Sequence, residues 1–249
     1  TAIIRSFFSL ISFCMESILL PSKIHYSPGE RPNEGVLTVE PCAHGYGTTL
    51  GNALRRVLLS SLSGAAVTAV KIKGADHEFS TIPNVKEDVL DIILNLKGLR
   101  MKLYAEEPIK LSLAVKGSRV VTGGDFKKDA QVEIANPDHS IATITEDKGS
   151  LEMDVWIGPG RGYQSTEERG KEKLELGTIA IDALYSPILN VSYKVEQTRV
   201  GEKTDFDKLL LRVETDGTLD PLDAIKQSVD MLMDYVHVLQ NLTVEGENA

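Results

Sequence analysis

The sequence has few cysteines and none of the short motifs that mark common catalytic, metal or nucleotide sites. Cys14 and Cys42 form no CxxC pair, which excludes a disulfide framework and a cysteine-rich zinc site. The five histidines are scattered without metal-ligand spacing. A nucleophile elbow, an HExxH motif, a Rossmann fingerprint and an aspartate-rich metal loop are all absent from the sequence. We therefore expect a protein of the reducing cytoplasm with no catalytic residues, no bound metal and no cofactor.

Basic residues are fewer than acidic ones, 27 against 36, so the formal net charge is −9. This balance argues against a protein whose main task is to bind the nucleic-acid backbone. The charge is uneven: residues 97–128 carry eight basic and three acidic side chains, whereas residues 129–182 carry five basic and twelve acidic ones. Solvated faces explain both stretches most simply, and a stand-alone nucleic-acid-binding module that uses residues 97–128 is an alternative.

Long apolar runs are confined to the first fourteen residues, which combine one arginine with an apolar stretch, as a signal peptide does. The stretch is too short to span a bilayer. Phe13 stands where a signal cleavage site needs a small residue, and Met15 begins a segment that looks like a natural start. We expect residues 1–14 to be an upstream or non-native extension and no contact with a membrane, with an export signal as the alternative.

The segment from His44 to Leu62 is the most informative part of the sequence. Its glycines, with Thr48 and Thr49, predict a turn and an N-cap before a run of good helix formers. An apolar stripe with helical spacing predicts a side that faces the core, formed by Leu50, Ala53, Leu54, Val57, Leu58 and Ser61. The opposite side carries Asn52, Arg55, Arg56 and Leu59. A bare leucine beside two arginines favours a contact surface; an ordinary amphipathic helix with one exposed leucine is the alternative.

A second helix is predicted to begin at Pro221, with Asp220 as its N-cap. It carries two adjacent apolar stripes: Leu222, Ile225, Val229, Leu232, Val236 and Leu239, and beside them Ser228, Met231, Tyr235, Val238 and Leu242. One stripe is enough to dock a helix on its own domain, so two favour burial against a second copy of the chain. A helix at the centre of its own core is the alternative.

Alternating apolar residues predict strands at residues 36–40, 67–73, 187–200 and 206–213 and a set of short strands over 109–157, with one more helix over 84–97. Strands and helices near both ends surround this all-strand middle. The arrangement predicts an α+β fold in which two helices and an antiparallel sheet form a discontinuous domain interrupted by an inserted β-rich domain.

Two segments could carry chemistry. Asp205 and Asp207 place two carboxylates on one face of a strand, so a metal-dependent enzyme that uses this pair is an alternative function. The glycine-rich segment at residues 158–162 could cradle a phosphate, but it lacks the GxxxxGK[ST] pattern and a following apolar helix. We expect it to be a mobile loop.

Residues 44–62 closely resemble the first dimerisation helix of the bacterial-type RNA polymerase alpha subunit. Six further segments match that family in the same order: HEFST at 77–81, EDVLDIILNLKGL at 87–99, GRGY at 160–163, DALYSP at 182–187, RVGEKTDFDKL at 199–209 and DGTLDP at 216–221. Seven collinear matches over about residues 15–243 identify the chain as a member of the family, in its N-terminal dimerisation and assembly region.

The resemblance implies a homodimeric scaffold that nucleates assembly of the two large catalytic subunits, of beta and beta-prime type, into a DNA-directed RNA polymerase. That enzyme is a nucleotidyltransferase, and the scaffold meets DNA only through the assembled complex. The implied dimerisation domain comprises residues 15–62 and 183–243, the inserted domain residues 63–182, and a linker or tail begins at 244–249. A second, DNA-binding domain, which most members carry, would be truncated or naturally absent.

The resemblance also implies contact residues. Contacts to the second-largest subunit fall on Arg56 and Leu59, and contacts to the largest subunit fall on Asp91, Lys97 and Ile181. The two helices at 49–62 and 219–242 would build a two-fold interface through Leu50, Leu54, Val57, Leu58, Leu232, Tyr235, Val236 and Leu239. In the family, the segment with Asp205 and Asp207 serves folding and subunit contact.

Overall fold

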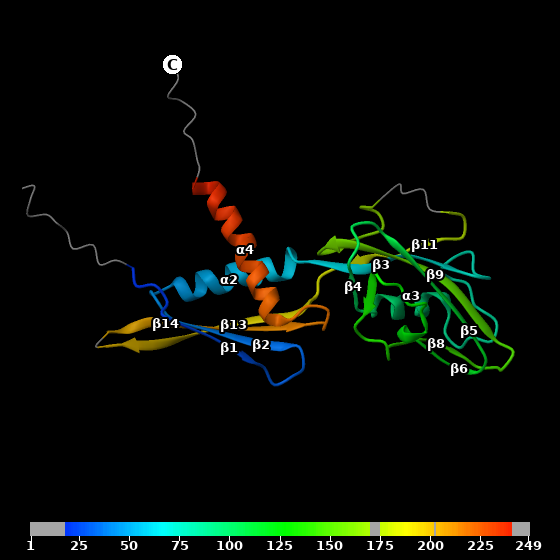
Figure 1. Ribbon diagram of the computed structural model, residues 1–249, viewed down its shortest axis with the longest axis horizontal. Helices are drawn as coiled ribbons and strands as arrows, with labels where there is room; N and C mark the ends of the chain where they lie inside the picture. The colour runs from blue at the N-terminus through cyan, green and yellow to red at the C-terminus, as the bar shows by residue number, and fades with distance from the viewer. Residues whose placement is uncertain (1–17, 170–174, 202, 241–249) are drawn as a thin grey trace, which may run out of the picture.

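The computed structural model describes residues 18–169, 175–201 and 203–240. The molecule is elongated and consists of two lobes that follow one another along its long axis (Figure 1). The predictions made for residues 1–14, Leu242 and residues 244–249 lie outside the described residues. The fold is α+β with mainly antiparallel sheets, as predicted. None of the described helices is long and apolar enough to cross a membrane.

The first lobe, which we call the terminal lobe, joins strands from both ends of the chain into one antiparallel sheet with the order β1-β2-β14-β13. Two helices, α2 and α4, pack against each other and on this sheet (Figure 1). The buried leucines Leu54 and Leu58 of α2 share a core with Leu209 and Leu211 of the sheet. The elements are β1 (Lys23–Pro28), β2 (Glu34–Cys42), α2 (Tyr46–Ser60), β13 (Ile188–Val200), β14 (Lys203–Thr215) and α4 (Pro221–Gln240).

The strands and helices predicted for this lobe are present, but the start of α2 differs from the prediction. Residues 188–200 and 203–215 pair as an antiparallel hairpin. Asp220 Oδ1 accepts a hydrogen bond from the Leu222 backbone N–H at 2.8 Å, which confirms the predicted N-cap of α4. The prediction that threonines cap α2 is wrong. The N-cap is Gly45, with a φ of 83°, and its residue type supplies no side chain for capping.

The second lobe, which we call the middle lobe, contains a sheet with the order β5-β9-β3-β4-β7, two short two-stranded sheets and one helix, α3, which packs against β3 and β8. The strand β11 also pairs with β3. The elements are β3 (Ser63–Ile72), α3 (Val89–Lys97), β4 (Met101–Leu103), β5 (Ile109–Lys116), β6 (Arg119–Thr122), the 3-10 turn η1 (Gly123–Asp125), β7 (Val132–Ile134), β8 (Ser140–Ile144), β9 (Ser150–Arg161), β10 (Tyr163–Gln164), β11 (Ile179–Ala180) and β12 (Ala183–Leu184).

Two predictions for the middle lobe are corrected. The helix expected from residue 84 begins only at Val89, because the Asp88 side chain accepts the Asp91 backbone N–H at 2.7 Å and thereby caps it. Residues 158–161 of the glycine-rich segment are not a mobile loop but the end of β9, which pairs with β3. Gly160 lies against the ring of Tyr185, where a Cβ would come within 2.5 Å, so this glycine serves close packing.

Candidate subunit interfaces

The outward side of α2 carries charge and one apolar side chain. Arg55 and Arg56 are exposed, and Leu59 retains 39 % of its accessible surface. Leu54 and Leu58 on the opposite side are buried, so the predicted division of the helix is confirmed. Neither arginine forms an ion pair with any described residue, which leaves both guanidinium groups available to a partner.

The position of α2 is determined by two buried glycines and a buried carboxylate. A Cβ on Gly51 would come within 2.7 Å of the Tyr193 ring, so only glycine allows the helix to lie this close to β13. Gly47 lies against the Asp207 side chain in the same way. Asp207 Oδ2 accepts the backbone N–H groups of Gly45 at 2.9 Å and Gly47 at 3.2 Å. The carboxylate therefore satisfies free N–H groups at the positive end of the helix dipole.

This arrangement gives one of the paired aspartates a structural role. Asp207 is 6 % exposed and is used by the start of α2, whereas Asp205 is exposed. The two carboxylates therefore lie in different environments. Among the residues that the structure describes, no group of three or more histidine, cysteine or carboxylate side chains is placed to hold a metal ion.

The two halves of α4 differ in burial. Ala224, Ile225 and Ser228 in the first half are buried on the terminal lobe. The second half projects away from the sheet (Figure 1), and its apolar side chains are exposed, with Tyr235 at 76 %, Val236 at 50 % and Leu239 at 62 %. Val238 and Met233 are exposed as well, while Leu232 is half-buried. In the described chain, the C-terminal part of both predicted apolar stripes on α4 is therefore exposed to solvent.

The residues expected at the dimer interface are not all on the surface. Leu54 and Leu58 are 7 % and 0 % exposed and fill the core of their own chain, as their place on the core-facing stripe predicted. Leu50 and Val57 are half-buried. Tyr235, Val236 and Leu239 on α4 are exposed, and their contact with a second copy of the chain stays a prediction.

The outward side of α3 carries the predicted residues Asp91 and Lys97, both exposed. Leu90 and Leu94 lie beside them one turn apart and are 42 % and 56 % exposed. The sequence prediction missed these two leucines. The sequence contained a signal for their exposure, because they fall outside the apolar stripe of α3 that contains the buried residues Val89, Ile92, Ile93 and Leu96.

Ile181 is a correction. Its side chain is 1 % exposed in the core of the middle lobe, so it offers no surface to a partner. The neighbouring Asp182 is better placed: its Oδ2 lies 3.3 Å from Lys97 Nζ, and its Oδ1 accepts the Thr166 backbone N–H at 2.9 Å. The Thr166 hydrogen bond, followed by the Lys97 ammonium, holds the pKa of Asp182 below its ordinary value. This carboxylate connects α3 with the segment that follows β10.

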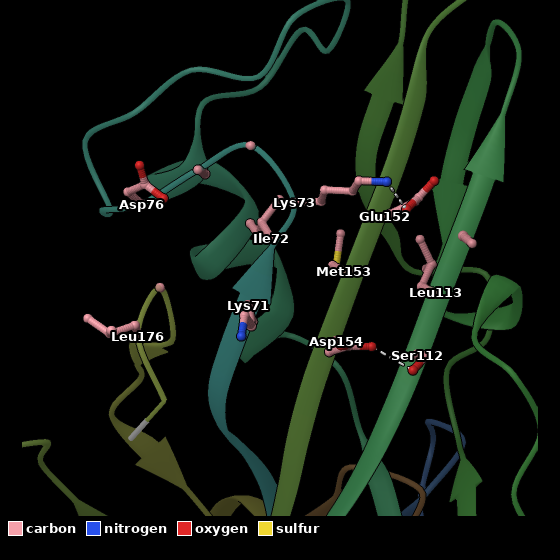
Figure 2. A pocket seen from close by; sticks show the side chains of 14 residues that line it. Lys71, Ile72, Lys73, Asp76, Ser112, Leu113, Glu152, Met153, Asp154 and Leu176 are labelled. Atoms are coloured by element: carbon pink, nitrogen blue, oxygen red, sulfur yellow. Dashed lines mark hydrogen bonds and ion pairs between the residues drawn. The ribbon is translucent and has the colours of Figure 1, made fainter. Parts of the chain in front are cut away.

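A groove with a volume of about 450 Å³ lies on the outer face of β3, β5 and β9 (Figure 2). Lys73 Nζ lies 2.8 Å from Glu152 Oε2, and Ser112 Oγ donates to Asp154 Oδ1 at 2.6 Å. Burial alone would raise the pKa of Asp154, but the hydrogen bonds from Ser112 and Lys110 hold it below its ordinary value. Lys73, Glu152 and Asp154 are therefore paired with other side chains across the strands.

Comparison with known proteins places the chain in a family. The sequence model of the RNA polymerase Rpb3/RpoA insert domain matches residues 70–186, which make up most of the middle lobe. Three curated relatives are named DNA-directed RNA polymerase subunit alpha. The relative from Roseiflexus sp. (strain RS-1) is 47 % identical over 218 residues, which cover 86 % of this chain and 67 % of the relative.

The other two relatives agree with the first. The one from Roseiflexus castenholzii (strain DSM 13941 / HLO8) is 50 % identical over 219 residues, with 87 % and 67 % of the two chains covered. The one from Alkaliphilus oremlandii (strain OhILAs) is 49 % identical over 209 residues, with 84 % and 66 % covered. The present chain thus spans about two thirds of the length of these relatives. It belongs to the family of DNA-directed RNA polymerase alpha subunits.

Proposed function

We propose that the chain is a non-catalytic scaffold of DNA-directed RNA polymerase. Two copies pair through the terminal lobe, and the dimer then recruits the two large subunits that form the active site, in the cytoplasm. The chain contacts DNA only as part of the assembled enzyme. The observation that carries the proposal is the uncovered apolar surface on the second half of α4, next to a helix that presents unpaired arginines.

The apolar surface of α4 supports pairing with a second copy. Tyr235, Val236 and Leu239 leave half or more of their surface to water. Burial of apolar surface contributes roughly 25 cal/mol per Å², so covering three such side chains in each of two copies favours association. A second copy brings the same surface, as an interface with two-fold symmetry requires. The proposed dimerisation domain comprises residues 15–62 and 183–243, with residues 63–182 as the inserted domain.

The outward sides of α2 and α3 support recruitment of the large subunits. On α2, Arg56 and Leu59 combine a bidentate hydrogen-bond donor with an apolar neighbour, a combination typical of interface anchors. We assign this surface to the second-largest subunit. On α3, Asp91 and Lys97 are assigned to the largest subunit, and the exposed Leu90 and Leu94 would supply its apolar contact.

Light scattering of the full chain tests the pairing, and co-purification tests the recruitment. We expect a mass near twice 27.2 kDa at micromolar concentration. The dimer should then retain the second-largest polymerase subunit from the same cells on an affinity column. A monomer that stays monomeric over this concentration range, or a dimer that retains neither large subunit, contradicts the proposal.

A further inference from the structure

The C-terminal end of α2 adjoins the hairpin-like pair of strands β10 and β12 in the middle lobe, which together with Arg161 and Gly162 we call the hairpin. Ser63, the first residue of β3, is the strand partner of Arg161 at the end of β9. A Cβ added to the next residue, Gly162, would lie 3.6 Å from the carbonyl oxygen of Ser60 in the last turn of α2. The chain then enters β10, where Tyr163 pairs with Leu184 of β12. Residues that are a hundred positions apart in the sequence therefore form one continuous surface.

This surface carries exposed apolar side chains. Tyr163 is 59 % exposed and Leu184 is 50 % exposed. Because they are direct partners in an antiparallel pair, their side chains project from the same face of the hairpin. Leu59, at the adjoining end of α2, is 39 % exposed. Exposed aromatic and aliphatic residues that gather in this way are typical of a protein-binding surface.

The same surface carries three arginines that are not neutralised. Arg55, Arg56 and Arg161 are exposed and form no ion pair with any residue that the structure describes. Three other arginines of this acidic chain form such pairs, Arg31 with Glu214, Arg119 with Asp125 and Arg212 with Glu34, whereas Arg100, Arg169 and Arg199 form none with the described residues. Three unpaired guanidinium groups beside apolar side chains fit a partner that presents carboxylates around an apolar centre.

The hairpin is held in place by the rest of the middle lobe. The Tyr185 backbone N–H donates to the Gly162 carbonyl at 2.8 Å, and Asp182 accepts the Thr166 N–H. The Arg169 guanidinium donates to the carbonyl oxygens of Thr68, at 3.1 Å, and Ile181. A surface that is ordered before binding loses less entropy when a partner docks on it.

We propose that Arg161, Tyr163 and Leu184 extend the α2 surface into a single docking site for the second-largest polymerase subunit. This inference rests on the proposed function, in which Arg56 and Leu59 bind that subunit. The partner surface is acidic at its rim and apolar at its centre. The strand pairing that joins Arg161 to the residues after α2 makes the hairpin continuous with the α2 surface, and we therefore assign it to the second-largest subunit.

The experiment measures the affinity of the full-length dimer for the recombinant second-largest subunit from the same cells. The variants are Tyr163→Ala, Leu184→Ala and Arg161→Glu. The matched controls are Tyr104→Ala and Val120→Ala, which truncate side chains of the same exposure, 59 % and 50 %, outside the hairpin. Each hairpin variant should raise the dissociation constant about tenfold, whereas the controls should leave it unchanged. The unfolding midpoint and the dimer mass should match those of the unmodified chain.

The outcomes separate this inference from the function on which it rests. Normal binding by all three hairpin variants, together with loss of binding by Arg56→Ala, overturns the inference and leaves the scaffold function intact. A loss of binding to the largest subunit alone also overturns it. If the hairpin variants instead abolish salt-dependent binding of plain duplex DNA, the arginines bind phosphate and the inference is wrong. Failure of the unmodified dimer to bind the subunit overturns both proposals.

Discussion

The Asp207 carboxylate on β14 accepts the backbone N–H groups of Gly45 and Gly47, 160 residues earlier in the chain. A residue of one strand thereby caps a helix that has no capping side chain of its own. The contact joins a strand from the C-terminal part of the chain to a helix from the N-terminal part. It explains how the terminal lobe can be built from two distant segments.

Replacing Asp207 with Ala should destabilise the terminal lobe. The change leaves two N–H groups at the start of α2 without their acceptor, and loss of a helix cap costs about 1–2 kcal/mol. Urea unfolding of the full chain measures the difference. Asp205→Ala is the control, because Asp205 is exposed, and it should change the free energy of unfolding by less than about 0.5 kcal/mol. Equal effects of the two substitutions would contradict the capping role.

Replacing Val236 with Asp should prevent pairing of two copies. The new carboxylate would be desolvated without a partner in the proposed interface. Light scattering should show a monomer or soluble aggregates. Val120→Asp is the matched control, since both valines are 50 % exposed, and it should remain a dimer. A dimeric Val236→Asp variant would place the interface elsewhere.

Replacing Arg56 with Ala should separate assembly from folding. Arg56 is exposed and opens no cavity when it is shortened, so the unfolding midpoint and dimer mass should not change. Its loss should weaken binding of the second-largest subunit by about 2 kcal/mol, or roughly 30-fold. Leu59→Ala should have a smaller effect. An unfolded Arg56→Ala protein would show that the residue belongs to the core.

Acid should weaken the turn between β1 and β2 through Glu34. Burial alone would raise the pKa of Glu34, but the Arg31 N–H, the Arg212 guanidinium and the Glu30 N–H together hold it below its ordinary value. A lowered pKa in the folded state contributes stability above the unfolded pKa, near 4.3. That stability is lost as the pH falls through the lower folded value.

Urea unfolding from pH 7 down to about pH 3 measures this loss. Glu34→Gln should be less stable than the unmodified chain at pH 7 and should lose less stability on acidification. A parallel pH dependence of the two proteins would show that Glu34 does not contribute. Glu107→Gln, at an exposed position, is the control and should follow the unmodified chain.

Sequence patterns located most elements because local spacing reports which side faces the core. The stripe with Leu54 and Leu58 separated the buried side of α2 from the side with Arg56. Predictions failed where a distant contact decided the outcome. Pro159 and Gly160 have turn-forming residue types, yet pairing with β3 makes them part of a strand. Ile181 shows the same limit, because the burial of a single residue depends on which element packs above it.

The sequence by itself determined the family, the α+β class and the amphipathic faces of α2 and α4, because these depend on residue order and on local periodicity. The tertiary structure alone decided that Asp207 caps α2, that Ile181 is buried and that the strand pair with Tyr163 and Leu184 adjoins the C-terminal end of α2. Each of these facts depends on segments that meet only after folding. Spacing along a chain defines the faces of one element, whereas packing between elements decides which faces remain free for a partner.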